Sequence, residues 1–419
     1  MMGVFRHSHI MPTKLRALIL LTLFFVIPTH AAKKNNRPIV LLISLDGFRY
    51  DYAEKYHAKN LIALGKRGVH AKAMLPAFPT TTFPNHYTIA TGLYPANHGI
   101  VENSFWDPDM KALFRFNDPK LASNPKFWGG TPLWVLAEKQ GVTAGCYFWP
   151  GSDYEIGGKR PTYWYPFDSK TKKETQIAQV VEWVKMPETK RPNFMTLYFS
   201  DVDHAGHDHG PDAEETRAAV EEVDRTLGEL FSQIKQTKVP VNIFVVSDHG
   251  MANVEPMVDL GKLANFEGVQ TAGSGTNFEV YSEDSNKIEE LYVALTKTPD
   301  PRFVVYRKAD IPARLHYSGS NRIGDLVVFS RQRLTVGVVD PKRAPRAGGP
   351  QKGNHGYDLE VVPEMRAIFY AAGPNLKGGG VVLEEFENIH VYPLIAKLLR
   401  LQVRDTIDGD LKVLETILK

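Results

Sequence analysis

The chain has 419 residues, of which 43% are hydrophobic and 23% charged, ordinary proportions for a globular protein with a large buried core. Its formal net charge is +3, with both signs interspersed and no basic run in the body of the chain. These properties give no reason to expect a nucleic-acid polymer as partner, whereas a small anionic substrate is compatible with them.

The first thirty-odd residues differ in character from everything after them. Basic residues precede a hydrophobic run over residues 17–27, and the small residues Ala31 and Ala32 follow. This pattern predicts a cleaved secretory signal over residues 1–32, so the mature protein would be periplasmic or secreted, without stable membrane association. The alternative is a retained membrane anchor, although the run is short for a span.

The mature chain contains a single cysteine, Cys146, and therefore no intramolecular disulfide. In an exported protein of this size, that favours a bacterial periplasm over a eukaryotic cell surface. Cys146 lies in the hydrophobic run 142–149, which predicts a buried and inert thiol. We expect residues 33–419 to form one domain and the protein to be a monomer.

The first regular element is an almost uninterrupted hydrophobic run over residues 38–45 that ends at Asp46. Such a run is typical of a strand buried on both faces of a parallel sheet. Helices are predicted over residues 52–64, where Gly65 would end the helix, and over residues 131–140. The run 142–149 predicts the next strand, and a helix follows in which Ile177, Val180, Val181 and Val184 share one face.

Two further hydrophobic runs, residues 193–199 and 241–246, repeat the first pattern and also end in acidic residues. A helix is predicted between them, with Asp212 and Glu215 forming a capping box at its start. The alternation of strands and helices indicates an α/β fold, with a doubly wound, mostly parallel sheet flanked by helices. Ligands of such sheets bind beyond the carboxyl ends of the strands.

The C-terminal third of the chain has a different pattern. Short hydrophobic runs within residues 277–330 flank a helix near residues 288–295, and we interpret this segment as an edge or small inserted subdomain. Residues 341–357 form a long Gly/Pro/Arg-rich stretch that contains His355, and long loops of this kind are usually functional. A strand at 367–371 and a helix at 389–399 complete the domain.

A candidate nucleophile lies in residues 74–103. Thr82 is followed by Phe83 and then by the hydrophobic segment 86–91, so it lies where a helix could begin and where anions are favoured. A threonine hydroxyl is a weak nucleophile at neutral pH, and it therefore needs a base or a metal ion to activate it.

Acidic residues and histidines gather just after predicted strands and in the long loop. Carboxylates and imidazoles are the ligands that zinc takes in hydrolytic sites, and six of them make two trios. Two metal ions about 4 Å apart can clamp a phosphoryl group. The candidate ligands are Asp46, Asp203 with His207, Asp248 with His249, and His355.

Each cluster alone has an ordinary structural explanation. Asp46 followed by Gly47 could be a simple turn, and His355 a loop histidine. Residues 201–211 could be a solvated polar loop, which also offers Asp201, His204, Asp208 and His209 as competing ligands. Only their joint occurrence after successive strands favours one shared site.

The order of these motifs closely resembles the nucleotide pyrophosphatase/phosphodiesterase family of the alkaline phosphatase superfamily, in the manner of a bacterial secreted member. The resemblance runs from residue 38 to the C-terminal helix and implies an alkaline phosphatase-like fold. The motifs are Asp46-Gly47, Thr82-Phe83-Pro84-Asn85-His86, His98-Gly99-Ile100 with Asn103, Asp203 to His207, Ser247-Asp248-His249-Gly250-Met251 and Gly353-Asn354-His355-Gly356.

By this resemblance, Thr82 is the nucleophile and becomes transiently phosphorylated, and each chain binds two zinc ions. Asn103 would donate a hydrogen bond to a nonbridging phosphate oxygen. One zinc would be held by Asp46, Asp248 and His249 together with the Thr82 oxygen, and the other by Asp203, His207 and His355. The resemblance gives no ligand role to His86 or His98, for which we expect packing or support of the ligands. His204 and His209 are expected to be loop residues near the metal.

The nature of the ester follows from the surroundings of Thr82. A threonine without a neighbouring arginine favours a diester over a monoester, and the sulfatase motif is missing. Resemblance to nucleotide-preferring members implies that Phe83 and Tyr198 flank the base, with Tyr165 or its neighbours Tyr163 and Trp164 opposite. Ordinary core packing is the alternative for these aromatic residues. The expected reaction is hydrolysis of phosphodiester or pyrophosphate bonds in small nucleotides, which releases nucleoside 5′-monophosphate.

Three other functions are considered. A choline-phosphodiester hydrolase would need an acidic and aromatic cage, for which Asp153 and Glu155 are available. A non-catalytic exported metal-binding protein would be expected to lack Thr82 or a ligand, and all seven residues are present. A metalloprotease would carry an HExxH helix, which the sequence lacks.

Overall fold

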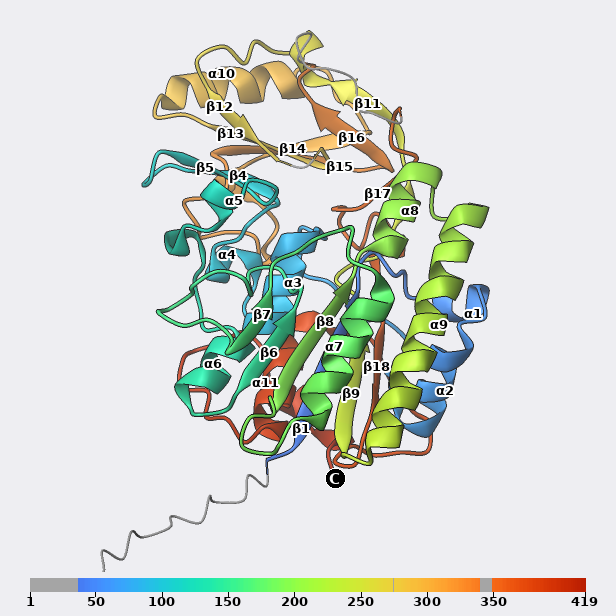
Figure 1. The fold of residues 1–419 in the computed structure, drawn as a ribbon. Helices are drawn as coiled ribbons and strands as arrows, with labels where there is room; N and C mark the ends of the chain where they lie inside the picture. The colour runs from blue at the N-terminus through green and yellow to red at the C-terminus, as the bar shows by residue number, and fades with distance from the viewer. Residues whose placement is uncertain (1–36, 274, 340–348) are drawn as a thin grey trace, which may run out of the picture. The chain divides into compact units, whose positions relative to one another are not determined.

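The computed structural model describes residues 37–273, 275–339 and 349–419. The predicted signal over residues 1–32 and residues 341–348 of the predicted loop lie outside the described residues. Across the described parts, the main sheet has eight strands (Figure 1). Their order is β19 (Val381–Leu383), β2 (Val69–Ala71), β18 (Phe369–Ala372), β9 (Val241–Val246), β1 (Ile39–Leu45), β8 (Phe194–Phe199), β6 (Ala144–Tyr147) and β7 (Tyr163–Tyr165).

The strands β9, β1, β8, β6 and β7 run parallel to one another. Strand β18 is antiparallel to both of its neighbours, β9 and β2. All seven residues of β1 are buried, which explains why the strand is an unbroken hydrophobic run. The prediction of a doubly wound, mostly parallel α/β sheet is confirmed.

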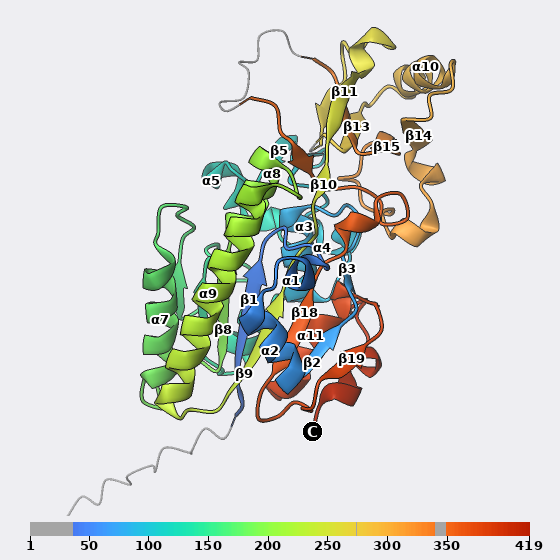
Figure 2. The ribbon, with the colours of Figure 1, turned by 90° about the vertical axis from the view of Figure 1, so that its right-hand side faces the viewer.

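Helices cover both faces of this sheet (Figures 1 and 2). Val40 and Leu42 of β1 belong to one hydrophobic core, whereas Leu41 and Ile43 belong to another on the opposite face. The first core includes residues of α3 (Thr82–Thr91), α6 (Leu133–Lys139) and α11 (Val391–Leu398). The second includes residues of α2 (Lys59–Arg67), α7 (Lys173–Lys185) and α9 (Glu214–Thr237).

The single helix predicted over residues 52–64 is wrong. The structure has two helices, α1 (Tyr52–Lys55) and α2, separated where His57 takes a left-handed conformation with φ of 54°. Gly65 does not end α2, which continues to Arg67. A Cβ atom at Gly65 would lie 3.0 Å from the ring of Tyr370, so glycine lets the helix pack closely against β18.

Two predictions for the residues that follow β8 are also wrong. Residues Asp201–His209 form helix α8, so His204 and His209 lie on a helix and not in a loop. The predicted capping box is absent, because the N-cap of α9 is Ala213 and makes no side-chain cap bond. The Asp212 carboxylate pairs instead with Lys55 and, at 3.4 Å, with Arg49.

A second sheet lies largely within the segment for which the sequence predicts edge or subdomain structure. It is antiparallel, in the order β12 (Gln270–Ala272), β13 (Asn277–Tyr281), β15 (Leu326–Ser330) and β14 (Phe303–Arg307). Helix α10 (Ser285–Thr296) packs on it through Leu291, in a hydrophobic core separate from those of the main sheet.

Short elements complete the described chain. The paired ones are β3 (Met74–Leu75) with β20 (Phe386–Glu387), β4 (Ser104–Asp107) with β5 (Ala112–Arg115), β10 (Ala252–Asn253) with β17 (Gly353–Asn354), and β11 (Glu255–Asp259) with β16 (Leu334–Gly337). The short helices are α4 (Pro95–His98) and α5 (Pro119–Ala122).

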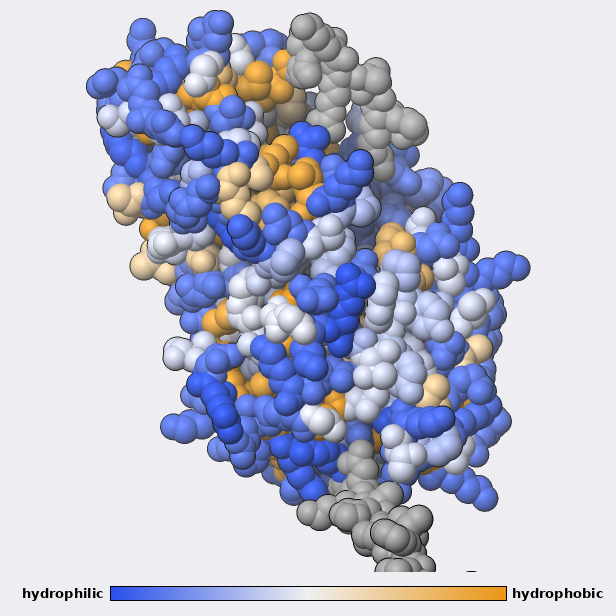
Figure 3. All heavy atoms as spheres, turned by 60° about the vertical axis from the view of Figure 1, so that its left-hand side comes forward, coloured by the Kyte–Doolittle hydropathy of each residue, from blue (hydrophilic) through white to orange (hydrophobic). Residues whose placement is uncertain are grey.

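On the face drawn in Figure 3, hydrophobic residues form separate small areas within a mostly hydrophilic surface. In the part of the chain that the structure describes, every helix is too short or too polar to cross a membrane.

Candidate active site

The candidate ligands converge because three adjacent strands end at the same edge of the main sheet. Asp46 directly follows β1, Asp248 and His249 follow β9, and α8 with Asp203 follows β8. Gly47, with φ of 66°, turns the chain immediately after Asp46. A Cβ atom at this glycine would lie 2.9 Å from Cα of Asp203, so only glycine allows the end of β1 to approach α8 this closely.

Asp203, His207 and His355 form the first trio of ligand atoms. Asp203 and His207 lie four residues apart on one face of α8, and His355 follows β17. The two Nε2 atoms are 3.1 Å apart, and they lie 3.4 Å and 3.6 Å from Asp203 Oδ1. Ligand atoms about 3.3 Å apart are what a tetrahedral zinc ion requires with bonds of 2.0–2.1 Å.

The second group of atoms surrounds His249 Nε2. This nitrogen is 2.9 Å from Asp248 Oδ2, 3.4 Å from Asp46 Oδ1 and 3.2 Å from the Thr82 hydroxyl. These separations again match the edge of a zinc coordination tetrahedron. The rings of His249 and His355 stack with centroids 3.6 Å apart, so the two groups adjoin.

The backbone orients each ligand imidazole in the same way. The Nδ1 atom of His207 lies 2.9 Å from the Gly353 carbonyl oxygen, that of His249 lies 2.9 Å from Gly250, and that of His355 lies 3.0 Å from Thr80. A carbonyl can only accept, so a proton on each Nδ1 would satisfy these contacts and leave Nε2 available to a metal ion. This is the tautomer that binds a metal through Nε2. The Nδ1 atom of His207 also lies 3.0 Å from the side-chain nitrogen of Gln351.

The carboxylates are crowded and incompletely bonded. Oδ1 of Asp46, Oδ1 of Asp203 and Oδ2 of Asp248 are buried and accept no hydrogen bond within the described residues. Burial and the neighbouring carboxylates raise the pKa of Asp46 well above its usual range. Burial alone would also raise the pKa of Asp248, but His249 and His86 outweigh it and hold that pKa well below normal. Buried, uncompensated carboxylate oxygens of this kind fit divalent cations.

The neighbouring histidines differ from the ligands. His86 also approaches Asp46 and Asp248, yet its Nε2 is 2.8 Å from the Ser44 hydroxyl and its Nδ1 is 2.9 Å from the Thr82 carbonyl oxygen. Both of its nitrogens therefore have protein partners. His98 is buried against Thr88, and burial lowers its pKa to about 3. His204 is exposed on α8.

Thr82 is the first residue of α3, and Asn103 is bonded to the next residue, Phe83. The Phe83 N–H, one of the unpaired donors at the start of this helix, donates to Asn103 Oδ1 at 2.9 Å. Because the oxygen of this amide is occupied, its NH₂ group is the part that can donate to an added oxygen. The start of α3 thus brings together the Thr82 hydroxyl and, through Phe83, the Asn103 amide.

The aromatic candidates lie in different surroundings. Phe83 is half-buried and contacts the exposed ring of Phe116, with centroids 5.3 Å apart. Tyr198 is 8% exposed and donates its hydroxyl hydrogen to Asp46 Oδ2, so it also orients a ligand. The Tyr165 ring stacks on Tyr147 at 4.5 Å, and its hydroxyl donates to Gln179.

The sequence does not single out Phe167 as a residue of the site. Its ring is 53% exposed and meets Tyr198 at 5.8 Å, which makes it the exposed aromatic side chain next to this part of the site. The signal that could have found it is weak, because Phe167 follows a cluster of aromatic residues at 163–165 that looks more prominent in the sequence.

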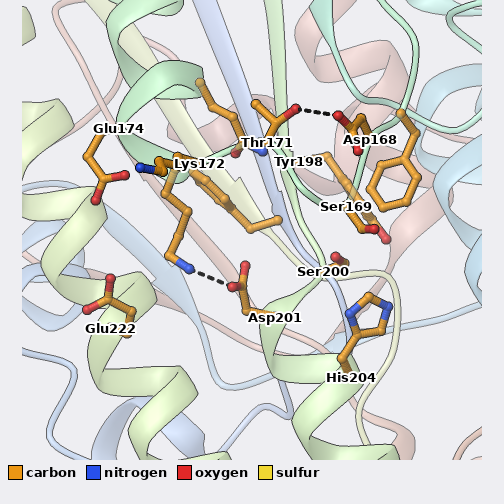
Figure 4. A pocket seen from close by; sticks show the side chains of 14 residues that line it. Asp168, Ser169, Thr171, Lys172, Glu174, Tyr198, Ser200, Asp201, His204 and Glu222 are labelled. Carbon is orange, nitrogen blue, oxygen red and sulfur yellow. Dashed lines mark hydrogen bonds and ion pairs between the residues drawn. The ribbon is translucent and has the colours of Figure 1, made fainter.

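A cavity of about 260 Å³ opens beside Tyr198 and Phe167 (Figure 4). It extends between α7, α8 and α9, and His204 and Asp201 line it from α8. The Lys173 ammonium pairs with Asp201 at 2.6 Å, so this positive charge is already compensated. The cavity is lined mainly by polar groups and lies next to the candidate metal ligands.

The fold and the site together define an α/β protein with a candidate two-metal centre built around a threonine. Residues 40–358 match the family described as type I phosphodiesterase / nucleotide pyrophosphatase. The chain belongs to this family, as its sequence motifs indicate.

Known relatives agree with this assignment. A venom phosphodiesterase of Crotalus durissus collilineatus is 37% identical over 377 residues, which cover 87% of this chain and 44% of the relative. The chain thus spans less than half the length of that relative. An uncharacterized pyrophosphatase/phosphodiesterase of Schizosaccharomyces pombe is 36% identical, over 86% of this chain and 77% of the relative.

Solved structures show the same fold. Murine ectonucleotide pyrophosphatase/phosphodiesterase 5 aligns with a TM-score of 0.84 and 31% identity, covering 91% of this chain and 100% of that chain. An inactive variant of the same murine protein, solved in complex with AMP, aligns with a TM-score of 0.84 and 30% identity.

Proposed function

We propose that this protein hydrolyses phosphodiester or pyrophosphate bonds of small nucleotides and releases nucleoside 5′-monophosphate. The observation that carries the proposal is the position of the Thr82 hydroxyl, 3.2 Å from His249 Nε2 and close to buried carboxylate oxygens that accept no hydrogen bond within the described residues. A hydroxyl in such surroundings is suited to attack phosphorus.

We propose two zinc ions as the resident metals. Asp203, His207 and His355 would hold one, because their ligand atoms lie together with the required spacing. Asp46, Asp248 and His249 with the Thr82 oxygen would hold the other, since His249 Nε2 lies 3.4 Å, 2.9 Å and 3.2 Å from their oxygens. Asp46 also groups with Asp203 and His249, and with His86 and Asp248, so Asp203 and His86 adjoin this second centre. Bound zinc would lower the pKa of the hydroxyl and offset negative charge on the phosphoryl group.

The residues of the chain would then act in two displacements. The Thr82 oxygen forms a bond to phosphorus, and the bond from phosphorus to the leaving oxygen breaks, which leaves a phosphothreonine. Water attacks the same phosphorus, the bond to Thr82 breaks, and the nucleoside monophosphate departs. The amide NH₂ of Asn103 donates to a nonbridging oxygen in both steps, since its own oxygen is held by Phe83 N–H.

The AMP complex of the murine relative supports a nucleotide as the small-molecule substrate. We propose that Phe83 and Tyr198 contact the nucleoside, with the exposed Phe167 beside them. A substrate role for Tyr165 stays a prediction, although this ring packs on Tyr147.

Thr82→Ala tests the proposal. We expect unchanged zinc content and a loss of p-nitrophenol release from p-nitrophenyl-TMP to below about 1% of wild type, because the variant lacks the hydroxyl that lies 3.2 Å from His249 Nε2. Turnover retained by this variant would remove Thr82 as the nucleophile.

A substrate panel defines the class of ester. With zinc restored, we expect ATP, a dinucleotide and p-nitrophenyl-TMP to be cleaved far faster than p-nitrophenyl phosphate or glycerophosphocholine. Preference for glycerophosphocholine would support the choline alternative, and preference for p-nitrophenyl phosphate would make the protein a monoesterase.

We also propose export of the chain, with residues 1–32 removed and residues 33–419 acting as one monomeric domain. The relatives whose names place them in venom or on the outside of cells support export. Residue-by-residue sequencing of the N-terminus of the mature protein tests the position of the cleavage.

A further inference from the structure

We propose that Glu102 is a positioning residue that holds Asn103 in register with Thr82, and that Asn277 links this carboxylate to the segment carrying His355. The proposal rests on the proposed function, because it assigns Glu102 an effect on the phosphate-binding amide. It also gives the second sheet a part in organising the site.

Glu102 is a fully buried carboxylate, with 0% of its surface exposed. Its Oε1 accepts the backbone N–H of Asn103 at 2.6 Å, and its Oε2 accepts Nδ2 of Asn277 at 3.0 Å. A buried carboxylate is costly unless donors compensate it, and bonds to a charged acceptor are stronger than neutral ones. The position of the Asn103 backbone is therefore tied firmly to Glu102.

Further bonds fix the rest of Asn103. Its side-chain oxygen accepts Phe83 N–H at 2.9 Å, and its backbone oxygen accepts Phe116 N–H at 3.0 Å. With the backbone N–H on Glu102, three of its polar groups are anchored, and the NH₂ group is the one available to a bound phosphate. A small shift of this backbone would move the amide away from a bound phosphate.

Asn277 joins this arrangement to the other side of the site. It is 2% exposed, and it is the first residue of β13 in the second sheet, opposite Phe329 of β15. Its NH₂ group reaches both Glu102 and, at 3.4 Å, the Gly356 carbonyl oxygen. Gly356 directly follows His355, so one amide connects the phosphate-binding segment with the segment of a metal ligand.

Asn103 N–H and Asn277 NH₂ both donate to Glu102, which makes the charge-neutral variant informative. A glutamine has one acceptor and one donor group in place of two acceptors. In Glu102→Gln the side-chain NH₂ must therefore face either Asn103 N–H or Asn277 NH₂, and one bond is lost in either orientation. The variant keeps the size of the side chain, so packing changes little.

The experiment is a double-mutant cycle with Asn103→Ala. With p-nitrophenyl-TMP, we expect Asn103→Ala to lower kcat about 100-fold and Glu102→Gln to lower it about 10-fold in the wild-type background. In the Asn103→Ala background, Glu102→Gln should change kcat less than about twofold, because it acts through the missing amide. An equal loss in both backgrounds, or no loss in either, would overturn the proposal.

Two further variants make the cycle decisive. Asp224→Asn is the matched control, since Asp224 is a buried carboxylate of α9 whose partners are Asn60 and the Leu61 N–H. Its effect on kcat should be the same in both backgrounds. Should Glu102→Gln be insoluble, Asn277→Ala enters the same cycle, with the same coupling expected and additivity counting against the proposal.

Binding of thymidine 5′-monophosphate separates this proposal from the proposed function. Measured by calorimetry, Glu102→Gln should weaken the affinity only while Asn103 is present. If wild-type protein cleaves none of the nucleotide substrates, the proposed function fails, and the binding cycle still decides the role of Glu102. If turnover is normal and the cycle is additive, only the role of Glu102 is refuted.

Discussion

Residue types in the sequence indicate that a metal site exists, but they do not identify which histidine of residues 201–209 is a ligand. Strand ends rich in aspartate and histidine pointed to a metal site, but the segment 201–209 offers His204, His207 and His209 without distinguishing among them. The resemblance selected His207, and the structure supplies a physical reason: on α8, this residue lies one turn after Asp203 and its Nδ1 meets the Gly353 carbonyl. Helical spacing does not select His207 from the sequence alone, because residues 201–211 also fit a solvated polar loop.

At this scale, His355→Ala tests the ligand assignment. We expect zinc content measured by mass spectrometry to fall from two to about one per chain, because Asp203 and His207 alone leave a trio incomplete. His204→Ala is the matched control, since His204 is exposed on the same helix as His207, and it should keep the wild-type content. A His355→Ala protein that still holds two ions would mean that another side chain is the ligand.

At the scale of elements, strands with a strong hydrophobic signal were predicted well and short ones were not. The runs that became β1, β8 and β9 are buried throughout, and burial on both faces is what makes such strands recognisable. Strands β2 and β19 have three residues each, too few to show any periodicity. The break between α1 and α2 depends on the left-handed His57, for which the sequence carries no clear signal.

The buried Glu279 of strand β13 should make the stability of the protein depend on pH. Tyr281, Tyr317 and the Gly324 N–H all donate to this carboxylate, yet burial raises its pKa to about 7. The unfolded carboxyl loses its proton near pH 4.5 and the folded one near 7. Its contribution to stability is therefore fully present below about pH 4.5 and is lost as the pH rises through 7.

The measurement compares wild type with Glu279→Gln in urea at pH 5 and pH 8. Relative to the variant, the free energy of unfolding of wild type should fall by roughly 2 to 3 kcal/mol between the two pH values. A difference between the two proteins that does not change with pH would show that Glu279 ionises normally in the folded chain.

At the scale of the whole molecule, the candidate ligands span residues 46 to 355 and meet only because the sheet brings them together. An unfolded chain would not hold six such groups at one point, so metal binding should favour the folded state. The sequence could predict this convergence from the common edge of parallel strands, but not the distances between atoms, which depend on turns such as the one at Gly47.

Removal of metal tests this coupling. Zinc at 1,000 times its Kd should stabilise the protein by about 4 kcal/mol, so treatment with a chelator should lower Tm by several degrees and added zinc should restore it. Magnesium is the control, since it prefers six oxygen ligands over imidazoles. An unchanged Tm after chelation would show that the ligand atoms carry no metal of consequence to folding.

The short ladder between β10 and β17 bears on how the two centres fill. Ala252 pairs with Asn354 and Asn253 with Gly353. The backbone that begins three residues after His249 is therefore paired with the two residues that precede His355. A metal ion that fixes the position of one imidazole therefore also restricts the backbone that carries the other. In the wild-type protein, the two centres should thus fill over the same range of zinc concentration during a titration.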